Sequence, residues 1–228
     1  MKHAGKATRA AFRTIYWSLV LMLGIMFAGV LARLLGQFVI EAAGVLAGVW
    51  VVFCLFCLYF FRDPQAHPPL DPDVIVAPGH GKVDAIDEVE EPSFMGGRCQ
   101  RISIFLSIFD VHVQNAPVAG RVVLRRYTPG RFVNAMRADS AEFNENVLVG
   151  IESSEREGER IGVRMIAGLI ARRIVSWAHE GDTVERGERL GLIRFGSRVD
   201  LYLPLGYPVE AQIGQRVRGG ETVMARRP

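Results

Sequence analysis

Two short stretches near the C-terminus carry the same pattern: GDTVERGERL at residues 181–190 and GQRVRGGETV at residues 214–223. In both, a glycine is followed after three residues by valine, after six by a second glycine, and after nine by leucine or valine. Glycine readily makes a tight turn, and a lone apolar residue between two turns tends to pack inward. The repeat therefore predicts two matching units, each a turn, a buried residue, a second turn and the start of a strand.

The chain from residue 74 onward has the same β character. Short apolar or alternating runs separated by glycine and proline are typical of a β-rich domain, and eight are present: Val74–Ala77, Ile102–Leu106, Arg121–Leu124, Val147–Ile151, Ile161–Met165, Arg173–Trp177, Leu190–Phe195 and Val199–Leu203. A turn or two of helix is expected around Val133–Asn146. The paired units resemble the hairpin repeats of lipoyl-like barrel-sandwich domains. A swinging-arm function is not expected, because Lys82 lacks the residues that flank the carrier lysine in those domains.

Two uncharged stretches precede this domain, at residues 15–32 and 42–61. A helix rises about 1.5 Å per residue, so about 20 apolar residues cross a hydrocarbon core of about 30 Å. Four Lys and Arg residues precede the first stretch and Arg62 follows the second, so the positive-inside rule places both ends in the cytoplasm. Residues 1–62 are predicted to form a transmembrane hairpin, the proline-rich residues 63–73 a linker, and residues 74–228 the functional domain.

Two other interpretations of the N-terminal segment stay open. The two stretches could lie flat in the membrane interface, or the first could be a cleaved signal peptide. A second apolar stretch directly behind the first, with no small-residue cleavage site before it, argues against the signal peptide. Cys54 and Cys57 have the CxxC spacing, but within an apolar span this favours small residues facing lipid or a helix over a metal or redox site.

Composition excludes several classes of function. The net charge of +3 comes from residues 1–62, where six Lys and Arg accompany a single acid, whereas a nucleic-acid-binding domain carries its basic stripe on its own folded surface. Three cysteines cannot build a disulfide framework, and 50% hydrophobic residues exclude intrinsic disorder. The sequence contains no phosphate loop, dinucleotide fingerprint, G-x-S-x-G elbow or histidine spacing suited to a metal.

Three motifs in a fixed order suggest a family: FDVHVQNAP at residues 109–117, GVRMIAGLIARR at 162–173 and RFGSRVD at 194–200. Together they resemble the phosphatidylserine decarboxylase proenzymes of the short bacterial and archaeal type. The resemblance extends from FRDP at residues 61–64 to TVMA at 222–225, nearly the whole predicted domain.

This resemblance implies a self-processing, pyruvoyl-dependent carboxy-lyase that uses neither a metal nor pyridoxal phosphate. The chain would cleave itself between Gly196 and Ser197, leaving a fragment 1–196 and a fragment 197–228 whose first residue, formerly Ser197, is a pyruvoyl group. That ketone would form a Schiff base with the amine of phosphatidylserine, and loss of CO₂ would give phosphatidylethanolamine. Glycine at 196 suits the cleavage, because it allows backbone conformations forbidden to other residues.

His112 is the candidate acid or base of the decarboxylation. An unperturbed imidazole titrates near pH 6.5 and can both accept and return a proton. If SIFDVHVQNAP is a strand, Asp110 and His112 lie on the same face, so the alternative is a structural histidine held by Asp110. Longer relatives have a second histidine three positions later, where this chain has Asn115, so no role carries over to that position.

A second departure concerns the base that activates the self-cleaving serine. The family usually reads Pro-Ala-Asp-Gly near the start of the domain, and its aspartate is thought to assist cleavage. This chain has Pro78-Gly79-His80-Gly81 instead. His80 is the candidate autocleavage base, with Asp84 and Asp87 as alternatives and an ordinary turn residue as the competing interpretation of His80.

The expected partners are a phospholipid substrate, the membrane and the chain's own cleaved fragments, with no nucleic acid. The expected location is the inner or plasma membrane of the cell, with the catalytic domain cytoplasmic. Two alternatives remain: the same chemistry on another serine-headgroup lipid, and a membrane-tethered lipoyl-like adaptor that never cleaves.

Overall fold

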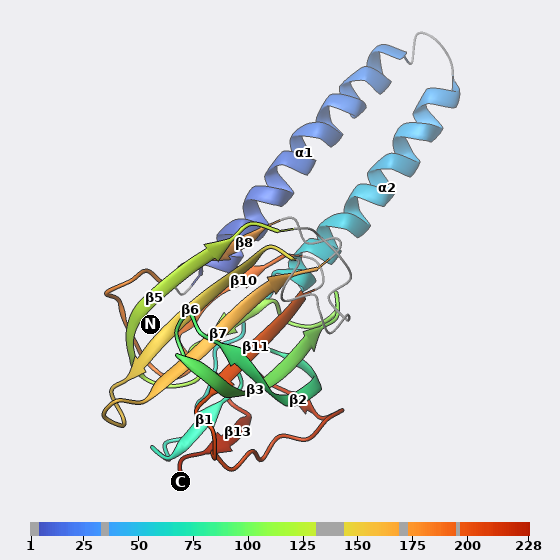
Figure 1. Cartoon of the computed structure of the whole chain (residues 1–228). Coiled ribbons are helices and arrows are strands. Elements are labelled where there is room, and N and C mark those ends of the chain that lie inside the picture. Colours follow the sequence, from blue (N-terminus) through green and yellow to red (C-terminus); the bar gives the residue numbers. More distant parts are fainter. Residues whose placement is uncertain (1–4, 33–36, 131–143, 169–172, 195–196) are drawn as a thin grey trace. The chain divides into compact units, whose positions relative to one another are not determined.

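The computed structural model describes residues 5–32, 37–130, 144–168, 173–194 and 197–228, with no side-chain description at 32 and 37–40. These residues divide into two compact units, an N-terminal helical unit that ends at Asp63 and a β unit that begins at Pro64 (Figure 1).

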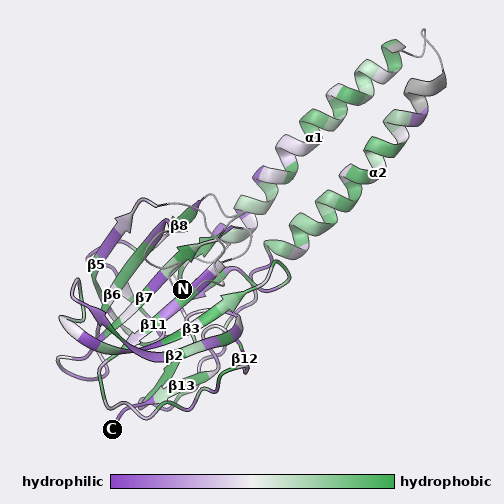
Figure 2. Ribbon diagram, turned by 45° about the vertical axis from the view of Figure 1, so that its right-hand side comes forward, coloured by the Kyte–Doolittle hydropathy of each residue, from purple (hydrophilic) through white to green (hydrophobic). Residues whose placement is uncertain are grey.

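The helical unit consists of α1 (Lys6–Ala32) and α2 (Gln37–Phe60). Both helices are long and apolar enough to cross a membrane, over Lys6–Leu31 and Glu41–Phe60, and Figure 2 shows hydrophobic residues along most of each. Large apolar side chains such as Trp17, 64% exposed, and Phe27, 68% exposed, leave a continuous apolar surface that water solvates poorly. The predicted helical hairpin is therefore present, and its first helix begins well before residue 15.

The described residues of the β unit form thirteen antiparallel strands in three sheets. The largest sheet has the order β12-β2-β3-β11-β7-β6-β5-β9, a second has the order β4-β10-β8, and β1 pairs with β13. The strands are β1 (Val74–Val76), β2 (Gly81–Glu91), β3 (Gly97–Leu106), β4 (Val113–Asn115), β5 (Gly120–Thr128), β6 (Asn146–Ser153), β7 (Arg160–Ala167), β8 (Ile174–Ser176), β9 (Thr183–Val184), β10 (Arg189–Ile193), β11 (Ser197–Leu203), β12 (Arg216–Val217) and β13 (Val223–Arg226).

The prediction of a β-rich domain is confirmed, since each of the eight predicted runs overlaps a strand. The sequence did not reveal β2, because five acidic side chains interrupt its apolar pattern. The helix expected around Val133–Asn146 falls mostly on residues 131–143, outside the described part of the chain, and Asn146 itself begins β6.

The two copies of the glycine repeat have matching structures. Their four turn glycines, 181, 187, 214 and 220, all have positive φ, between 76° and 91°, a region that disfavours other residues. Gly181 donates its N–H to the carbonyl of Val122, and Gly214 donates to that of Val83, both at 2.8 Å. The strands that follow these turns, β9 and β12, occupy opposite edges of the large sheet. The repeat thus builds both edges of the sheet in the same way.

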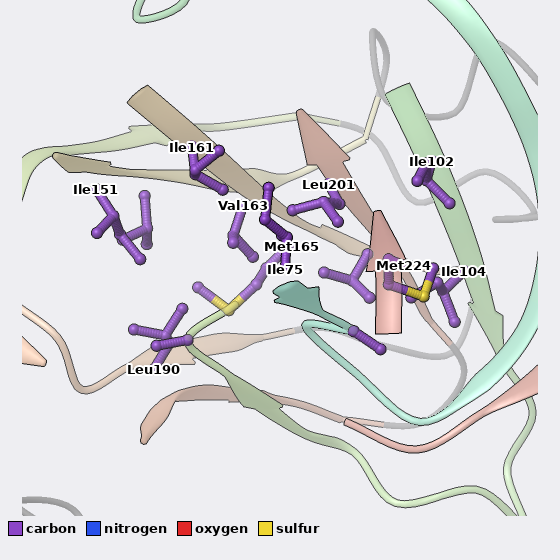
Figure 3. Packing of buried hydrophobic residues seen from close by; sticks show 14 of the residues in the cluster. Ile75, Ile102, Ile104, Ile151, Ile161, Val163, Met165, Leu190, Leu201 and Met224 are labelled. Atoms are coloured by element: carbon purple, nitrogen blue, oxygen red, sulfur yellow. The ribbon is translucent and has the colours of Figure 1, made fainter. Parts of the chain in front are cut away.

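The core lies between the large sheet and the two smaller ones (Figure 3). Fully buried aliphatic side chains from all three sheets meet there, among them Ile75 of β1, Ile104 of β3, Leu190 of β10 and Met224 of β13. Alternate residues of β11, Val199, Leu201 and Leu203, face this core, so the inner face of β11 is apolar.

The proline-rich segment before β1 has no helix or strand, but it is bound to the β unit rather than free. The guanidinium of Arg186 donates to the carbonyl oxygens of Pro69 and Asp71. A Cβ added to Gly220 would lie 2.6 Å from the Cβ of Ala66, so Ala66 packs directly on a repeat turn. Little of residues 64–73 is therefore left as a flexible tether.

Candidate active site

Ser197 is the first residue of β11, which lies between β3 and β7 within the large sheet. It pairs with Leu106 of β3 and with Ala167 of β7. Because side chains alternate along a strand, Ser197 faces the same side as Val199, the core. The preceding residues, Phe195 and Gly196, lie outside the described residues, and so does the geometry of the bond expected to break.

The hydroxyl of Ser197 is buried. Its side chain is 0% exposed, and its Oγ has no hydrogen-bond partner among the described residues. An unsatisfied buried hydroxyl costs about 1–3 kcal/mol, so such groups are rare in folded proteins and often mark function. An uncompensated nucleophilic oxygen at the predicted cleavage position fits the conversion of this residue to a pyruvoyl group.

The opposite face of β11 carries a buried ionic network that the sequence analysis missed. The guanidinium of Arg198 contacts the carboxylate of Asp200 at 2.9 Å and the hydroxyl of Ser103 at 2.5 Å. Its Nη1 also lies 3.6 Å from Oδ2 of Asp84. Arg198 is 1% exposed, so the side chain that follows Ser197 is held from three directions. The alternation of charged with apolar residues in SRVDLYL was the available signal.

Asp84 and Asp87, the two alternative bases, occupy different environments. Asp87 accepts two hydrogen bonds from Arg101, at 2.9 and 2.6 Å, and this salt bridge commits its carboxylate. Asp84 sits at a β-bulge in β2. Burial raises the pKa of Asp84, outweighing the Arg198 charge that lowers it. Asp84 contacts Arg198, which points to the face of β11 opposite Ser197, so neither aspartate shares the serine's side.

His80 lies in a turn that reaches the serine's side of β11. A Cβ on the neighbouring Gly79 would lie 2.9 Å from Cγ1 of Val199, so only glycine fits this approach. Lys82 of β2 pairs with Phe105 of β3, and Phe105 pairs in turn with Arg198 of β11. The next row therefore aligns Gly81 with Leu106 and Ser197, and two strand spacings, about 10 Å, separate the outer backbones. The structure thus brings the His80 turn to the end of the sheet where Ser197 lies.

The interpretation of residues 107–117 as one strand is wrong, because only Val113–Asn115 form β4. The residues before it form a turn in which the Asp110 carboxylate accepts bonds from both the N–H and the hydroxyl of Ser107. The contact between Asp110 and His112 joins the carbonyl oxygen of Asp110 to Nδ1 of His112, at 2.9 Å. The side chain of Asp110 is thus engaged by the turn and by Arg216, 3.1 Å away.

His112 itself is fully buried. A carbonyl oxygen can only accept, so the contact with Asp110 places a proton on Nδ1 and leaves Nε2 as the ring nitrogen that this contact does not use. The carbonyl of His112 accepts from the N–H of Ile193, four residues before Ser197, and the strand ending at Leu106 pairs with Ser197. The loop that carries His112 is therefore attached to the chain on both sides of the predicted cleavage site.

Asn115 supports a turn of the glycine repeat. It is buried in β4, and its Nδ2 donates to the carbonyl of Gly187 at 2.8 Å. Among the described residues, no three His, Cys, Asp or Glu side chains come together as metal ligands. Gln114, which the sequence did not single out, is 0% exposed, and neither end of its amide bonds to any other described residue.

Comparison with known proteins gives one consistent result. Residues 53–225 match the family model described as phosphatidylserine decarboxylase. Similar curated proteins, each named phosphatidylserine decarboxylase proenzyme, come from Desulfotalea psychrophila, Symbiobacterium thermophilum and Gluconacetobacter diazotrophicus. They are 42%, 45% and 48% identical to this chain, over 89%, 89% and 77% of its length and 94%, 93% and 78% of their own.

Proposed function

The chain belongs to the phosphatidylserine decarboxylase family and is a carboxy-lyase, and from this premise we propose that it makes its own pyruvoyl group at Ser197 and uses it to convert phosphatidylserine to phosphatidylethanolamine. The observation that carries the proposal is the buried, unpartnered Oγ of Ser197 at the start of β11. The proenzyme names of the relatives agree with a chain that is cleaved.

The proposed self-cleavage uses only atoms of the chain. Ser197 Oγ attacks the carbonyl carbon of Gly196, and the amide becomes an ester with a free amine on residue 197. Loss of the Cα proton of residue 197 then breaks its Cβ–O bond, so Gly196 leaves as a carboxylate and residue 197 becomes dehydroalanine. Addition of water and loss of ammonia give the ketone.

The pyruvoyl group then supplies an electrophile for the substrate's amine and an electron sink for the pair left behind by CO₂. Residues of this chain hold the pyruvoyl-bearing residue in place and protonate the decarboxylated carbon. Arg198, bonded to Asp200 and Ser103, fixes residue 197 in the sheet after the backbone is cut. His112 presents Nε2 as the atom that carries a proton to the decarboxylated carbon.

His80 is proposed as the base of the cleavage step. It belongs to the Pro78–Gly81 turn, which packs on Val199, on the face of β11 to which Ser197 belongs. Arg101 binds Asp87, and Asp84 contacts Arg198 on the opposite face. Of the three candidates, His80 thus has the most direct approach to the serine.

The two apolar helices associate the enzyme with a membrane. We propose the inner or plasma membrane, with the β unit on the cytoplasmic side. Lys and Arg residues lie at the start of the first span, and Arg62 follows the second. A substrate confined to a lipid leaflet is then met at high effective concentration. The paired repeat turns also support a lipoyl-like barrel-sandwich architecture for the β unit.

One gel tests the proposal. Purified full-length protein should separate into fragments of about 22 and 3–4 kDa, taking about 110 Da per residue for 196 and 32 residues. Ser197→Ala should remain a single 25.3 kDa chain and should not decarboxylate phosphatidylserine. An intact Ser197 in active wild-type protein, detected by mass spectrometry of the 197–228 segment, would refute the mechanism. Product analysis with other serine-headgroup lipids tests the choice of substrate.

A further inference from the structure

Gln114 is the most anomalous polar side chain in the described part of the chain. It is 0% exposed, and neither Oε1 nor Nε2 has a hydrogen-bond partner among the residues that the structure describes. A buried amide that bonds to nothing destabilises the fold. Its retention within a strand therefore requires a compensating role, and a bound ligand is one that would satisfy the amide.

The register shows where this amide points. Gln114 of β4 pairs with Gly191 of β10, and paired residues of antiparallel strands share a face. A Cβ on Gly191 would lie 3.0 Å from Sδ of Met165, which is a core residue of β7. Gln114 therefore faces the interior between the two sheets.

Ser197 faces the same interior. Met165 pairs with Val199 of β11, and Ser197 is two residues away on the same side of that strand. The N–H of Ile193 bonds to the carbonyl of His112, so the β4–β10 pairing continues toward the loop that carries the candidate acid. Two unpartnered polar groups, the Gln114 amide and Ser197 Oγ, thus enter one apolar interior from facing sheets.

We infer that Gln114 binds the carboxylate of the substrate's serine headgroup and is a specificity-determining residue of the decarboxylation. This inference rests on the proposed function of Ser197. The Nε2 group donates to one carboxylate oxygen beside the residue derived from Ser197. Decarboxylation moves negative charge out of the carboxylate, so a cationic partner would stabilise the ground state more than the transition state. A neutral amide orients the carboxylate without that penalty.

The test compares substrate with product, because phosphatidylethanolamine has the same amine, phosphate and acyl chains but no carboxylate. In detergent–phospholipid micelles, Gln114→Met should still self-cleave. Its KM for phosphatidylserine should rise about tenfold or more, as for loss of a hydrogen bond to a charged group. Inhibition by phosphatidylethanolamine should change less than about twofold, since the lost contact is absent from the product.

Thermal unfolding provides a readout independent of activity. Gln114→Met should leave the Tm unchanged or raise it, because it removes an unsatisfied buried amide. The matched control is Gln100→Met, since the Gln100 amide, turned so that its nitrogen faces the carbonyl oxygens of Pro204 and Tyr207, donates to them at 3.2 and 3.1 Å. This control should lower the Tm. Gln114→Leu repeats the test with a second apolar side chain.

Several results would overturn the inference. Three results would each contradict a contact between Gln114 and the substrate carboxylate. These are an unchanged KM for phosphatidylserine, an equal loss of affinity for both lipids, and a clear fall in Tm. Loss of self-cleavage in both apolar variants would assign the amide to processing instead. A wild-type protein that never cleaves or turns over would refute the proposed function, whatever Gln114 does to the Tm.

Discussion

Nη1 of Arg198 lies 3.6 Å from Oδ2 of Asp84, on the face of β11 opposite to Ser197. The second residue after the proposed cleavage site is thus tied to another strand of the sheet. Asp200 and Ser103 complete this contact. The backbone at residue 197 can then be cut while the new chain end keeps its place in the sheet.

Replacing Arg198 by Met should destabilise the protein strongly. Asp200 is 0% exposed, and removing one partner of a buried ion pair typically costs about 3–5 kcal/mol. We expect the Tm to fall by about 10 °C in a domain of this size. Arg98→Met is the control, because Arg98 is an exposed partner of Glu88 and should change the Tm little. Similar Tm values for the two variants would contradict the proposed anchor.

Two carboxylates, Asp84 and Glu159, should change the stability of the fold in opposite directions as the pH rises. Burial raises the pKa of Asp84 above its ordinary 3.8, so its favourable contribution is complete below pH 3.8 and is lost as the pH rises through the folded pKa. Asp84→Asn should therefore gain Tm relative to wild type between pH 4 and pH 7. Thermal melts across this range measure the difference.

Glu159 provides the comparison. Burial raises its pKa, but bonds from Arg227, Ser153 and Tyr207 outweigh it, so the net pKa lies below its ordinary 4.5. Its contribution is present above pH 4.5 and is lost as the pH falls through the folded pKa. Glu159→Gln should lose Tm relative to wild type most strongly at pH 7. The same sign for both variants would contradict these assignments.

The turns of the repeat could be predicted from sequence, whereas the charged network could not. Gly181, Gly187, Gly214 and Gly220 are required by local backbone geometry, which a glycine spacing reveals directly. The contact between Asp84 and Arg198 depends on a β-bulge and on the pairing of distant strands. No local pattern encodes either feature.

The interpretation of the segment around Asp110 and His112 as a strand was wrong for a related reason. Its residues alternate as a strand would, but the carboxylate of Asp110 bonds back to Ser107 and closes a turn. Side-chain to backbone bonds of this kind compete with strand pairing and override the alternation. The candidate itself, His112, was chosen through the family resemblance rather than through its geometry, and its role remains a prediction.

A substitution of Gly220 should show how tightly the proline-rich segment is bound. Gly220→Ala must adopt a positive φ and must also displace Ala66. Gly158→Ala has the same problem of positive φ, but its Cβ meets nothing within 4 Å. Both should lower the Tm through backbone strain, and Gly220→Ala should lower it further. Equal losses would show that the segment moves aside freely.

His80→Ala should slow self-cleavage while leaving the fold intact. A positioned general base typically contributes about 10²–10⁴ in rate, so the uncleaved chain should accumulate and convert slowly on a time-course gel. Added imidazole should restore part of the rate. His67→Ala is the control, since His67 is an exposed residue of the proline-rich segment. Normal cleavage of His80→Ala, with a block in Asp84→Asn, would transfer the role to Asp84.

His112 can be tested by two substitutions that each keep one part of its ring. The Nδ2 group of asparagine overlays Nδ1 of histidine and can still donate to the carbonyl of Asp110, 2.9 Å from Nδ1 in the native protein, but it has nothing at the Nε2 position. If Nε2 carries the proton, His112→Asn should fold and self-cleave normally while kcat falls by about 10²–10⁴. His112→Ala loses the Asp110 bond as well, and its Tm should drop by a few degrees below that of His112→Asn, since a neutral hydrogen bond contributes about 1 kcal/mol. A purely structural histidine predicts instead that His112→Asn retains its kcat as well as its Tm. Decarboxylation of phosphatidylserine, measured on protein already shown by gel to be cleaved, separates the two roles.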